Sequence, residues 1–206
     1  MAELKSADFP WSPTRQTVHL CLDMQGLFAP GGAWPTPWML QVLPNILQIV
    51  AHGAERTIFT RFVPPQVSSD ARGTWRHYYD LHEETTREKL DPAALDLLKP
   101  LAEFVPPALV IDKPVYSAFL GSSLRQTLMQ RGADGLIITG AETDVCVLAT
   151  VLDAVDLGYP VYVVTDAVCG STDLSHDAVL TLYRTRFYQQ VQTLTTDALL
   201  ALWPAN

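Results

Sequence analysis

The chain has 206 residues, of which 48% are hydrophobic and 17% charged. This length predicts a single domain over residues 1–206, and the apolar content provides a sizeable core, which excludes an intrinsically disordered chain. With 14 basic and 22 acidic residues the formal net charge is −8. An acidic surface repels phosphate backbones, so nucleic acid is not an expected partner.

The hydropathy of the sequence indicates neither a signal peptide nor a membrane-spanning helix. The first 16 residues mix charge and proline and lack the apolar centre of a signal peptide. No apolar run approaches the roughly 18 residues that a membrane-spanning helix requires. We therefore expect a cytoplasmic protein with no membrane partner.

Six short runs of apolar, largely β-branched residues predict strands that are buried on both faces, as in a parallel sheet. In chain order the runs are Val18–Leu22, Thr57–Thr60, Leu109–Ile111, Gly135–Thr139, Val161–Thr165 and the weaker Val191–Leu194. Segments with helical spacing alternate with them: Met39–Ala51, Ala93–Phe104, Ser122–Gln130, Thr143–Leu157, Ser175–Gln189 and Asp197–Leu202. This alternation predicts an α/β fold, a three-layer α-β-α sandwich with a mainly parallel, six-stranded, Rossmann-like sheet.

One long segment, Val63–Leu90, interrupts this alternation after the second predicted strand. It is polar and aromatic and has no strand pattern. Long excursions of this kind in a compact domain often cover or line a functional site. We expect this segment to contribute to the substrate pocket.

The three cysteines, Cys21, Cys146 and Cys169, are too few and too scattered for a disulfide framework. No Cys-x-x-Cys pair occurs, so the sequence offers neither a zinc ribbon nor a thioredoxin-like motif. Cys21 lies inside the first predicted strand and is expected to be a core residue. Cys169 follows the fifth strand, where the neighbouring residues offer it no catalytic partner.

Three residues of catalytic types follow three predicted strands: Asp23, Lys113 and Cys146. Ligands of open parallel sheets bind beyond the carboxyl ends of the strands, so these side chains are expected to meet at one edge. A thiolate is a nucleophile, and a helix N-terminus and a nearby cation both lower a thiol pKa. Cys146 is therefore the candidate nucleophile, activated by Lys113, with Asp23 as the general acid and base.

Each of the three also has an ordinary structural interpretation. An aspartate after a strand is often a turn or helix cap, and a lysine is most often exposed. A free cysteine is more commonly a small buried hydrophobe than a nucleophile. The residue types and spacing alone leave both interpretations open.

The motifs resemble those of the isochorismatase-like cysteine hydrolases, a group that includes nicotinamidases, N-carbamoylsarcosine and ureido-compound amidohydrolases, and isochorismatases. The resemblance is specific at Asp23–Phe28 (DMQGLF), Lys113–Phe119 (KPVYSAF) and Gly140–Val147 (GAETDVCV), and extends to Thr165–Leu180. It covers almost the whole chain. It implies an Asp–Lys–Cys triad and a thioester intermediate, with an amine or ammonia as the leaving group.

The resemblance also implies a cis peptide bond between Ala141 and Glu142. The backbone N–H groups of Glu142 and Cys146 would then form the oxyanion hole. Nicotinamidases typically carry a D-x-H metal motif after the second strand, where this chain reads Thr60–Val63 (TRFV). The sequence therefore predicts neither a metal ion nor another cofactor, and it disfavours a nicotinamidase.

Aromatic residues near these motifs are candidates for the substrate pocket. Phe28 and Trp75 are expected to form facing walls, with Tyr116 and Phe119 at the rim. Stacked aromatic faces favour a small planar substrate. Two arginines, Arg61 and Arg72, are candidates for binding a substrate carboxylate. Ordinary packing in the core or in an interface explains the aromatic residues equally well, and the sequence leaves both interpretations open.

The favoured function is hydrolysis of a small-molecule amide or ureide through a thioester on Cys146. An alternative is hydrolysis of a vinyl ether of the isochorismatase type, in which Asp23 protonates the substrate and the cysteine is a bystander. A third is a catalytically inactive binding homologue. The family resemblance also implies a homo-oligomer, a dimer or larger.

Overall fold

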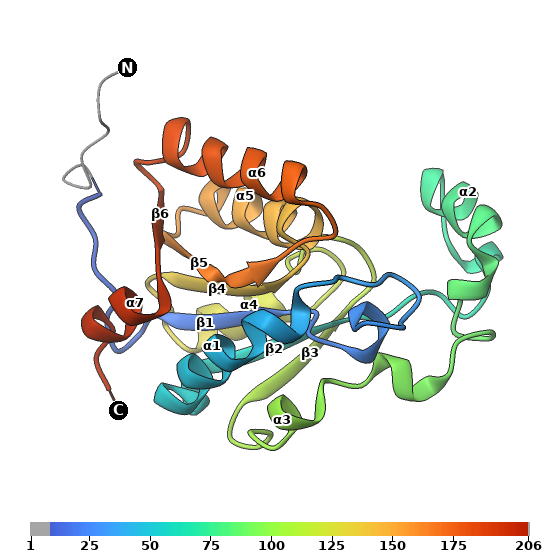
Figure 1. Ribbon diagram of the computed structural model, residues 1–206, viewed down its shortest axis with the longest axis horizontal. Coiled ribbons are helices and arrows are strands. Elements are labelled where there is room, and N and C mark those ends of the chain that lie inside the picture. Colours follow the sequence, from blue (N-terminus) through green and yellow to red (C-terminus); the bar gives the residue numbers. More distant parts are fainter. Residues whose placement is uncertain (1–8, 206) are drawn as a thin grey trace.

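The computed structural model describes residues 9–205 and contains a six-stranded parallel sheet (Figure 1). The strands are β1 (Val18–Leu22), β2 (Thr57–Phe62), β3 (Leu109–Lys113), β4 (Leu136–Ala141), β5 (Val161–Cys169) and β6 (Val191–Leu194). Their order across the sheet is β3-β2-β1-β4-β5-β6, and every neighbouring pair is parallel. This is the Rossmann-like order, and it confirms the predicted fold class.

Helices cover both faces of the sheet (Figure 1). On one face lie α1 (Met39–His52), α3 (Lys99–Ala102) and α7 (Thr196–Leu202), and on the other lie α4 (Leu124–Gln130), α5 (Leu148–Asp156) and α6 (Asp173–Thr185). Two separate cores result because successive strand residues point to opposite faces. In β1, for example, Cys21 belongs to the first core, whereas Leu20 and Leu22 belong to the second. Cys21 is the buried core residue that the sequence predicts.

The strand order reverses between β1 and β4, which is where an open α/β sheet binds its ligands. Gly140 of β4 permits a close approach here, because it has a φ of +101°. A Cβ atom at this position would overlap the backbone of Leu22. The glycine thus lets the ends of β1 and β4 lie side by side.

The predicted helix over Ala93–Phe104 is wrong. The chain instead forms a 3-10 turn, η6 (Pro92–Leu95), and the single helical turn α3, with an extended stretch between them. The reason is that this stretch pairs with the loop after β1: the Leu98 N–H donates to the Met24 carbonyl, and the Gly26 N–H to the Asp96 carbonyl. These backbone bonds replace the helical ones.

The other boundaries shift by smaller amounts. The predicted helix over Ser175–Gln189 lies at Asp173–Thr185, where the Thr172 hydroxyl caps the helix by accepting from the Ser175 N–H. The predicted helix over Thr143–Leu157 begins with a π-helical turn, η7 (Thr143–Val147), before α5. Among residues 9–205, no helix combines the length and apolar character needed to cross a bilayer.

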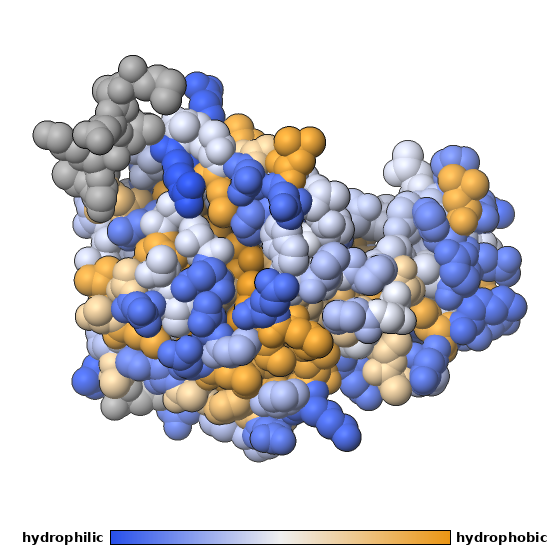
Figure 2. All heavy atoms as spheres, viewed as in Figure 1, coloured by the Kyte–Doolittle hydropathy of each residue, from blue (hydrophilic) through white to orange (hydrophobic). Residues whose placement is uncertain are grey.

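The segment after β2 forms an arm that projects from the body at one end (Figure 1). It contains the 3-10 turns η4 (Ser68–Asp70) and η5 (Glu83–Thr85) and the helix α2 (Thr74–Leu81). The outer surface of the arm is mostly hydrophilic (Figure 2). Its inner aromatic side chains contact the residues that follow β1 and β3, so the arm closes one side of the candidate site.

Candidate active site

Asp23 stands directly after β1 and is completely buried. It has a left-handed backbone with a φ of +51°, which aspartate tolerates better than most residues. The Thr60 hydroxyl donates to Asp23 Oδ1 at 2.6 Å, and the Asp23 N–H donates to the Thr60 carbonyl at 3.2 Å. The end of β2 therefore fixes this carboxylate, and Oδ2 is directed to Lys113.

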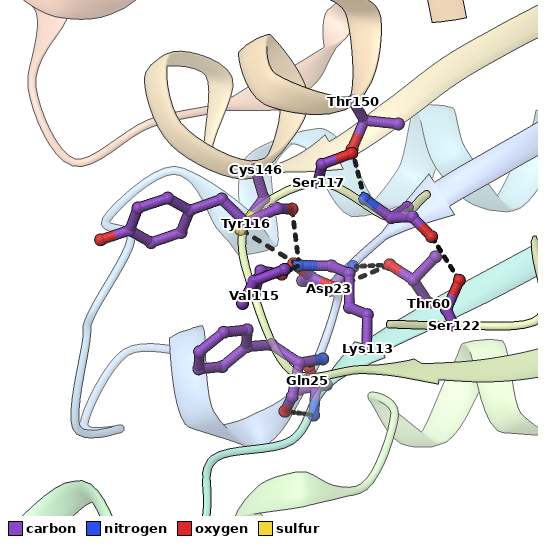
Figure 3. A network of polar contacts seen from close by, with 12 residues as sticks. Asp23, Gln25, Thr60, Lys113, Val115, Tyr116, Ser117, Ser122, Cys146 and Thr150 are labelled. Atoms are coloured by element: carbon purple, nitrogen blue, oxygen red, sulfur yellow. Dashed lines mark hydrogen bonds and ion pairs between the residues drawn. The ribbon is translucent and has the colours of Figure 1, made fainter. Parts of the chain in front are cut away.

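Lys113 is the last residue of β3, and its ammonium group lies at the centre of the site (Figure 3). Nζ is 2.7 Å from Asp23 Oδ2 and 3.3 Å from Cys146 Sγ. It also donates to the carbonyl oxygens of Val115 and Tyr116, at 3.0 and 2.9 Å. The lysine thus joins the carboxylate and the thiol and leaves none of its donors unpaired.

The loop that supplies these two carbonyl groups is tied to α5. The Ala118 N–H donates to the Thr150 hydroxyl at 3.1 Å, and the Ser117 hydroxyl donates to the Asp153 carboxylate. Because α5 directly follows the turn that carries Cys146, the loop and the cysteine are held relative to one another.

Cys146 lies in the π-helical turn η7 after β4, with 3% of the residue exposed. The predicted cis peptide bond between Ala141 and Glu142 is present. The N–H groups of Val145 and Val147 both donate to the Glu142 carbonyl, at 3.1 and 3.0 Å, and so define the turn. π-Helical turns of this kind are frequent at functional sites.

The surroundings of Cys146 raise the pKa of its thiol, contrary to the expectation that this pKa is lowered. Burial, and secondly the negative charge of Asp23, raise the pKa of Cys146, and Lys113 only partly opposes them. Burial also disfavours the Lys113 ammonium, but the charges of Asp23 and Cys146 outweigh it and raise the pKa of Lys113. The position of Cys146 at the start of a helix favours the thiolate, but it does not compensate for the effect of burial on the pKa.

Asp23 keeps one free acceptor site for the thiol proton. Apart from the ion pair with Lys113, no donor among residues 9–205 hydrogen-bonds to Asp23 Oδ2. A proton that leaves Cys146 can therefore pass to this oxygen while Lys113 stays charged. The net charge of the three groups does not change in that transfer.

A cavity of about 150 Å³ ends at Cys146. It is lined by Phe28, Trp34, Phe62, Trp75, Tyr78, Tyr116, Glu142, Val145 and Cys146. Three of the aromatic residues expected in the pocket, Phe28, Trp75 and Tyr116, thus lie around it. Its size admits only a small molecule.

Three aromatic pocket residues were not predicted from the sequence. Trp34 stacks on Phe28 with ring centroids 5.9 Å apart, Phe62 lies at the end of β2, and Tyr78 lies one turn after Trp75 on α2. The spacing of Tyr78 from Trp75 was a usable signal, since residues three apart share a helix face. Phe62 also carried one, because it lies just after the predicted second strand, at the edge where the sheet binds ligands. Trp34 carried none, because its place depends on how the loop after β1 folds back.

Phe119 does not line the cavity, although the sequence predicts it at the rim. It packs against the core beneath α4 and lines a separate surface hollow with Ser122 and Met129. The reason is that the chain turns after Lys113, so that Tyr116 faces the cavity and Phe119 faces the opposite layer.

The two arginines also lie elsewhere. Arg61 forms an ion pair with Asp112 at 2.7 Å, outside the cavity. Arg72 lines a larger hollow of about 650 Å³ between the arm and the residues after β3. Trp75 lines both spaces, but Cys146 is not among the residues of the larger one. Among residues 9–205, therefore, no arginine lines the cavity at Cys146, where it could bind a substrate carboxylate.

The residues that replace the D-x-H motif do not fit a metal ion. Thr60 donates to Asp23, Arg61 pairs with Asp112, and Phe62 belongs to the cavity wall. In the part of the chain that the structure describes, no three His, Cys, Asp or Glu side chains gather in a group that could hold a metal.

Comparisons with known proteins agree with this architecture. The family model of the isochorismatase domain matches residues 17–197. A probable inactive nicotinamidase of Arabidopsis thaliana is 31% identical over 173 residues, which cover 80% of this chain and 86% of the relative. A ureidoacrylate amidohydrolase of Stutzerimonas stutzeri is 40% identical over 77 residues, 37% of this chain and 29% of the relative. The crystal structure of an isochorismatase family protein from Desulfovibrio vulgaris superposes with a TM-score of 0.78 at 24% identity, covering 90% of this chain and 96% of that one.

Proposed function

Because the chain belongs to the isochorismatase family of hydrolases, we propose that it hydrolyses a carbon–nitrogen bond in a small-molecule amide or ureide. One observation carries this proposal: the Lys113 ammonium contacts both the Asp23 carboxylate and the Cys146 thiol at the end of an aromatic cavity. The amidohydrolase among the relatives supports the same class of bond.

In the first half of the reaction, Cys146 Sγ attacks the carbonyl carbon and its proton passes to Asp23 Oδ2. This transfer fits the raised pKa of Cys146, because the resting thiol holds its proton until a substrate is present. Lys113 keeps its charge throughout and stabilises first the Asp23 carboxylate and then the thiolate. General base assistance of this kind typically contributes about 10²–10⁴-fold to the rate.

Negative charge develops on the carbonyl oxygen during this attack. We assign the oxyanion hole to the backbone N–H groups of Glu142 and Cys146, as the family resemblance implies. Hydrogen-bond donors that are held in place before the reaction stabilise such charge without reorganisation, and one donor is typically worth about 3–4 kcal/mol.

After the attack, Asp23 returns the proton to the leaving nitrogen, and an amine or ammonia departs, which completes the acylation of Cys146. The acyl group is then bound to Cys146 as a thioester. Asp23, again ionised, takes a proton from water as the water attacks the thioester carbonyl. The acid is released and the thiol regains its proton, so the cycle needs no cofactor.

The test is hydrolysis of a panel of small primary amides and ureides, and the measured quantity is the ammonia released. We expect Cys146→Ala and Asp23→Asn to lower kcat by about a thousand-fold or more, because residues that act as a unit fail together. Phe119→Ala, outside the cavity, is the matched control. Full activity in Cys146→Ala would refute the thioester route.

The same variants separate the alternatives. Hydrolysis of an enol ether that survives in Cys146→Ala but not in Asp23→Asn would support acid-catalysed ether cleavage instead. Binding of panel members without turnover by the unaltered protein would support an inactive homologue, as the name of the Arabidopsis relative describes that protein.

A further inference from the structure

The cavity at Cys146 contains one carboxylate that the proposed reaction does not use, the side chain of Glu142. Glu142 directly follows β4, is partly buried, and lines the cavity together with Cys146. Its backbone N–H is assigned to the oxyanion hole, but that role makes no use of the side chain. A carboxylate-bearing residue in the wall of the same cavity as the reacting sulfur bears on which substrates bind.

The rest of the cavity wall is mostly aromatic. Besides Glu142, Val145 and Cys146, every lining residue has an aromatic ring: Phe28, Trp34, Phe62, Trp75, Tyr78 and Tyr116. The faces of aromatic rings carry partial negative charge and attract cations. An aromatic enclosure with one carboxylate is the arrangement that suits an ammonium or other cationic group.

The charge of Glu142 has no partner of opposite sign within residues 9–205, where Glu142 forms no ion pair. Burial, and after it the negative charge of Asp144, raise the pKa of the Glu142 carboxyl, and the Ser171 hydroxyl only partly offsets them. Its charge in turn contributes to the raised pKa values of Tyr78 and Tyr116, so the pocket residues lie in its field.

The neighbouring catalytic groups do not neutralise Glu142. Asp23 and Lys113 form an ion pair and balance one another, and burial raises the pKa of Cys146, which favours the neutral thiol. The site therefore has an excess of one negative charge when Glu142 is ionised. A substrate carboxylate would be repelled, and the arginines that could offset the repulsion lie outside the cavity.

We propose that this pocket selects small amides or ureides that carry a cationic group, such as a protonated or quaternary amine, bound between the Glu142 carboxylate and the aromatic faces. This inference rests on the proposed hydrolase function and names its substrate class. Aromatic faces attract a cation, and the opposite charge of the carboxylate adds to this attraction.

The test uses two amides of the same shape that differ by one charge. They are betaine amide, which carries a trimethylammonium group, and 3,3-dimethylbutanamide, in which carbon replaces the nitrogen. The measured quantity is the ratio of kcat/KM for the cationic amide to that for the neutral one. In the unaltered protein we expect a ratio of at least about ten.

The variant Glu142→Gln keeps the size of the side chain and removes its charge. We expect it to lower the ratio by at least about ten-fold. Glu103→Gln makes the same change at an exposed site beyond α3 and should leave the ratio within about two-fold, which controls for the overall field of the protein. An unchanged ratio in Glu142→Gln, or a neutral amide that reacts equally well, would overturn the inference while the hydrolase function stands.

A binding measurement separates this inference from the reaction itself. Calorimetric titration of betaine amide into Cys146→Ala and into the Cys146→Ala, Glu142→Gln double variant needs no turnover. Binding that weakens at least about ten-fold in the double variant supports the cation site, even if neither amide is hydrolysed and the proposed function fails. Equal binding to both variants, or binding to neither, overturns it.

Discussion

Replacing Lys113 by methionine isolates what burial does to an ion pair in this protein. The Lys113–Asp23 pair and the exposed Arg61–Asp112 pair have the same nitrogen–oxygen distance, 2.7 Å. The side chains of the first pair are 0% exposed, whereas those of Arg61 and Asp112 are 30% and 49% exposed. Lys113→Met leaves the Asp23 carboxylate buried and uncompensated, which typically costs about 3–5 kcal/mol. Arg61→Met leaves Asp112 in contact with water and should cost about 1 kcal/mol or less.

Urea unfolding followed by circular dichroism measures both free energies, provided that the slope with denaturant is unchanged. Adding Asp23→Asn to Lys113→Met removes the orphaned charge and should restore part of the lost stability. Two results would refute this reasoning. One is a cost for Lys113→Met no greater than that for Arg61→Met, and the other is purely additive costs for the two substitutions at the buried pair.

Three further predictions concern reactivity, pH and the pocket. Because burial and Asp23 raise the pKa of Cys146, its alkylation by iodoacetamide should be slower at pH 7 than that of a free thiol, whose pKa is about 8.5, and should still rise above pH 9; a plateau below pH 8 would contradict this. Burial lowers the pKa of His19 to about 3 from 6.5, so only the unfolded chain takes up this proton between those values. The free energy of unfolding should therefore decrease as the pH is lowered, by about 2 kcal/mol from pH 7 to pH 5 at about 1.4 kcal/mol per pH unit. His19→Gln should lack this component in urea titrations. Trp75→Ala should raise KM about ten-fold for whichever amide is hydrolysed, while Phe119→Ala should not, and equal KM values would place Trp75 outside the substrate site.

The sequence was sufficient for the sheet and for the meeting of the three candidate catalytic side chains. Runs such as Val18–Leu22 are apolar because both faces of a parallel strand are buried, so their pattern alone locates the strands. Asp23, Lys113 and Cys146 come together because parallel strands direct their carboxyl ends to one edge.

The sequence was not sufficient where tertiary contacts decide. The stretch before α3 lies extended because its backbone pairs with the loop after β1, and no local pattern indicates this. The direction of the pKa shift of Cys146 was likewise wrong, because it depends on burial. The side chain of Glu142 became informative only when the cavity showed what surrounds it.

The most direct test of the central claim is to trap the acyl group on Cys146. Excess protein is mixed with an amide that it hydrolyses, quenched in acid within one turnover, and weighed intact by mass spectrometry. We predict a mass increase equal to the acyl group minus one hydrogen, located at Cys146, lost on treatment with hydroxylamine and absent from Cys146→Ala. Turnover without any such adduct, and undiminished in Cys146→Ala, would contradict the account.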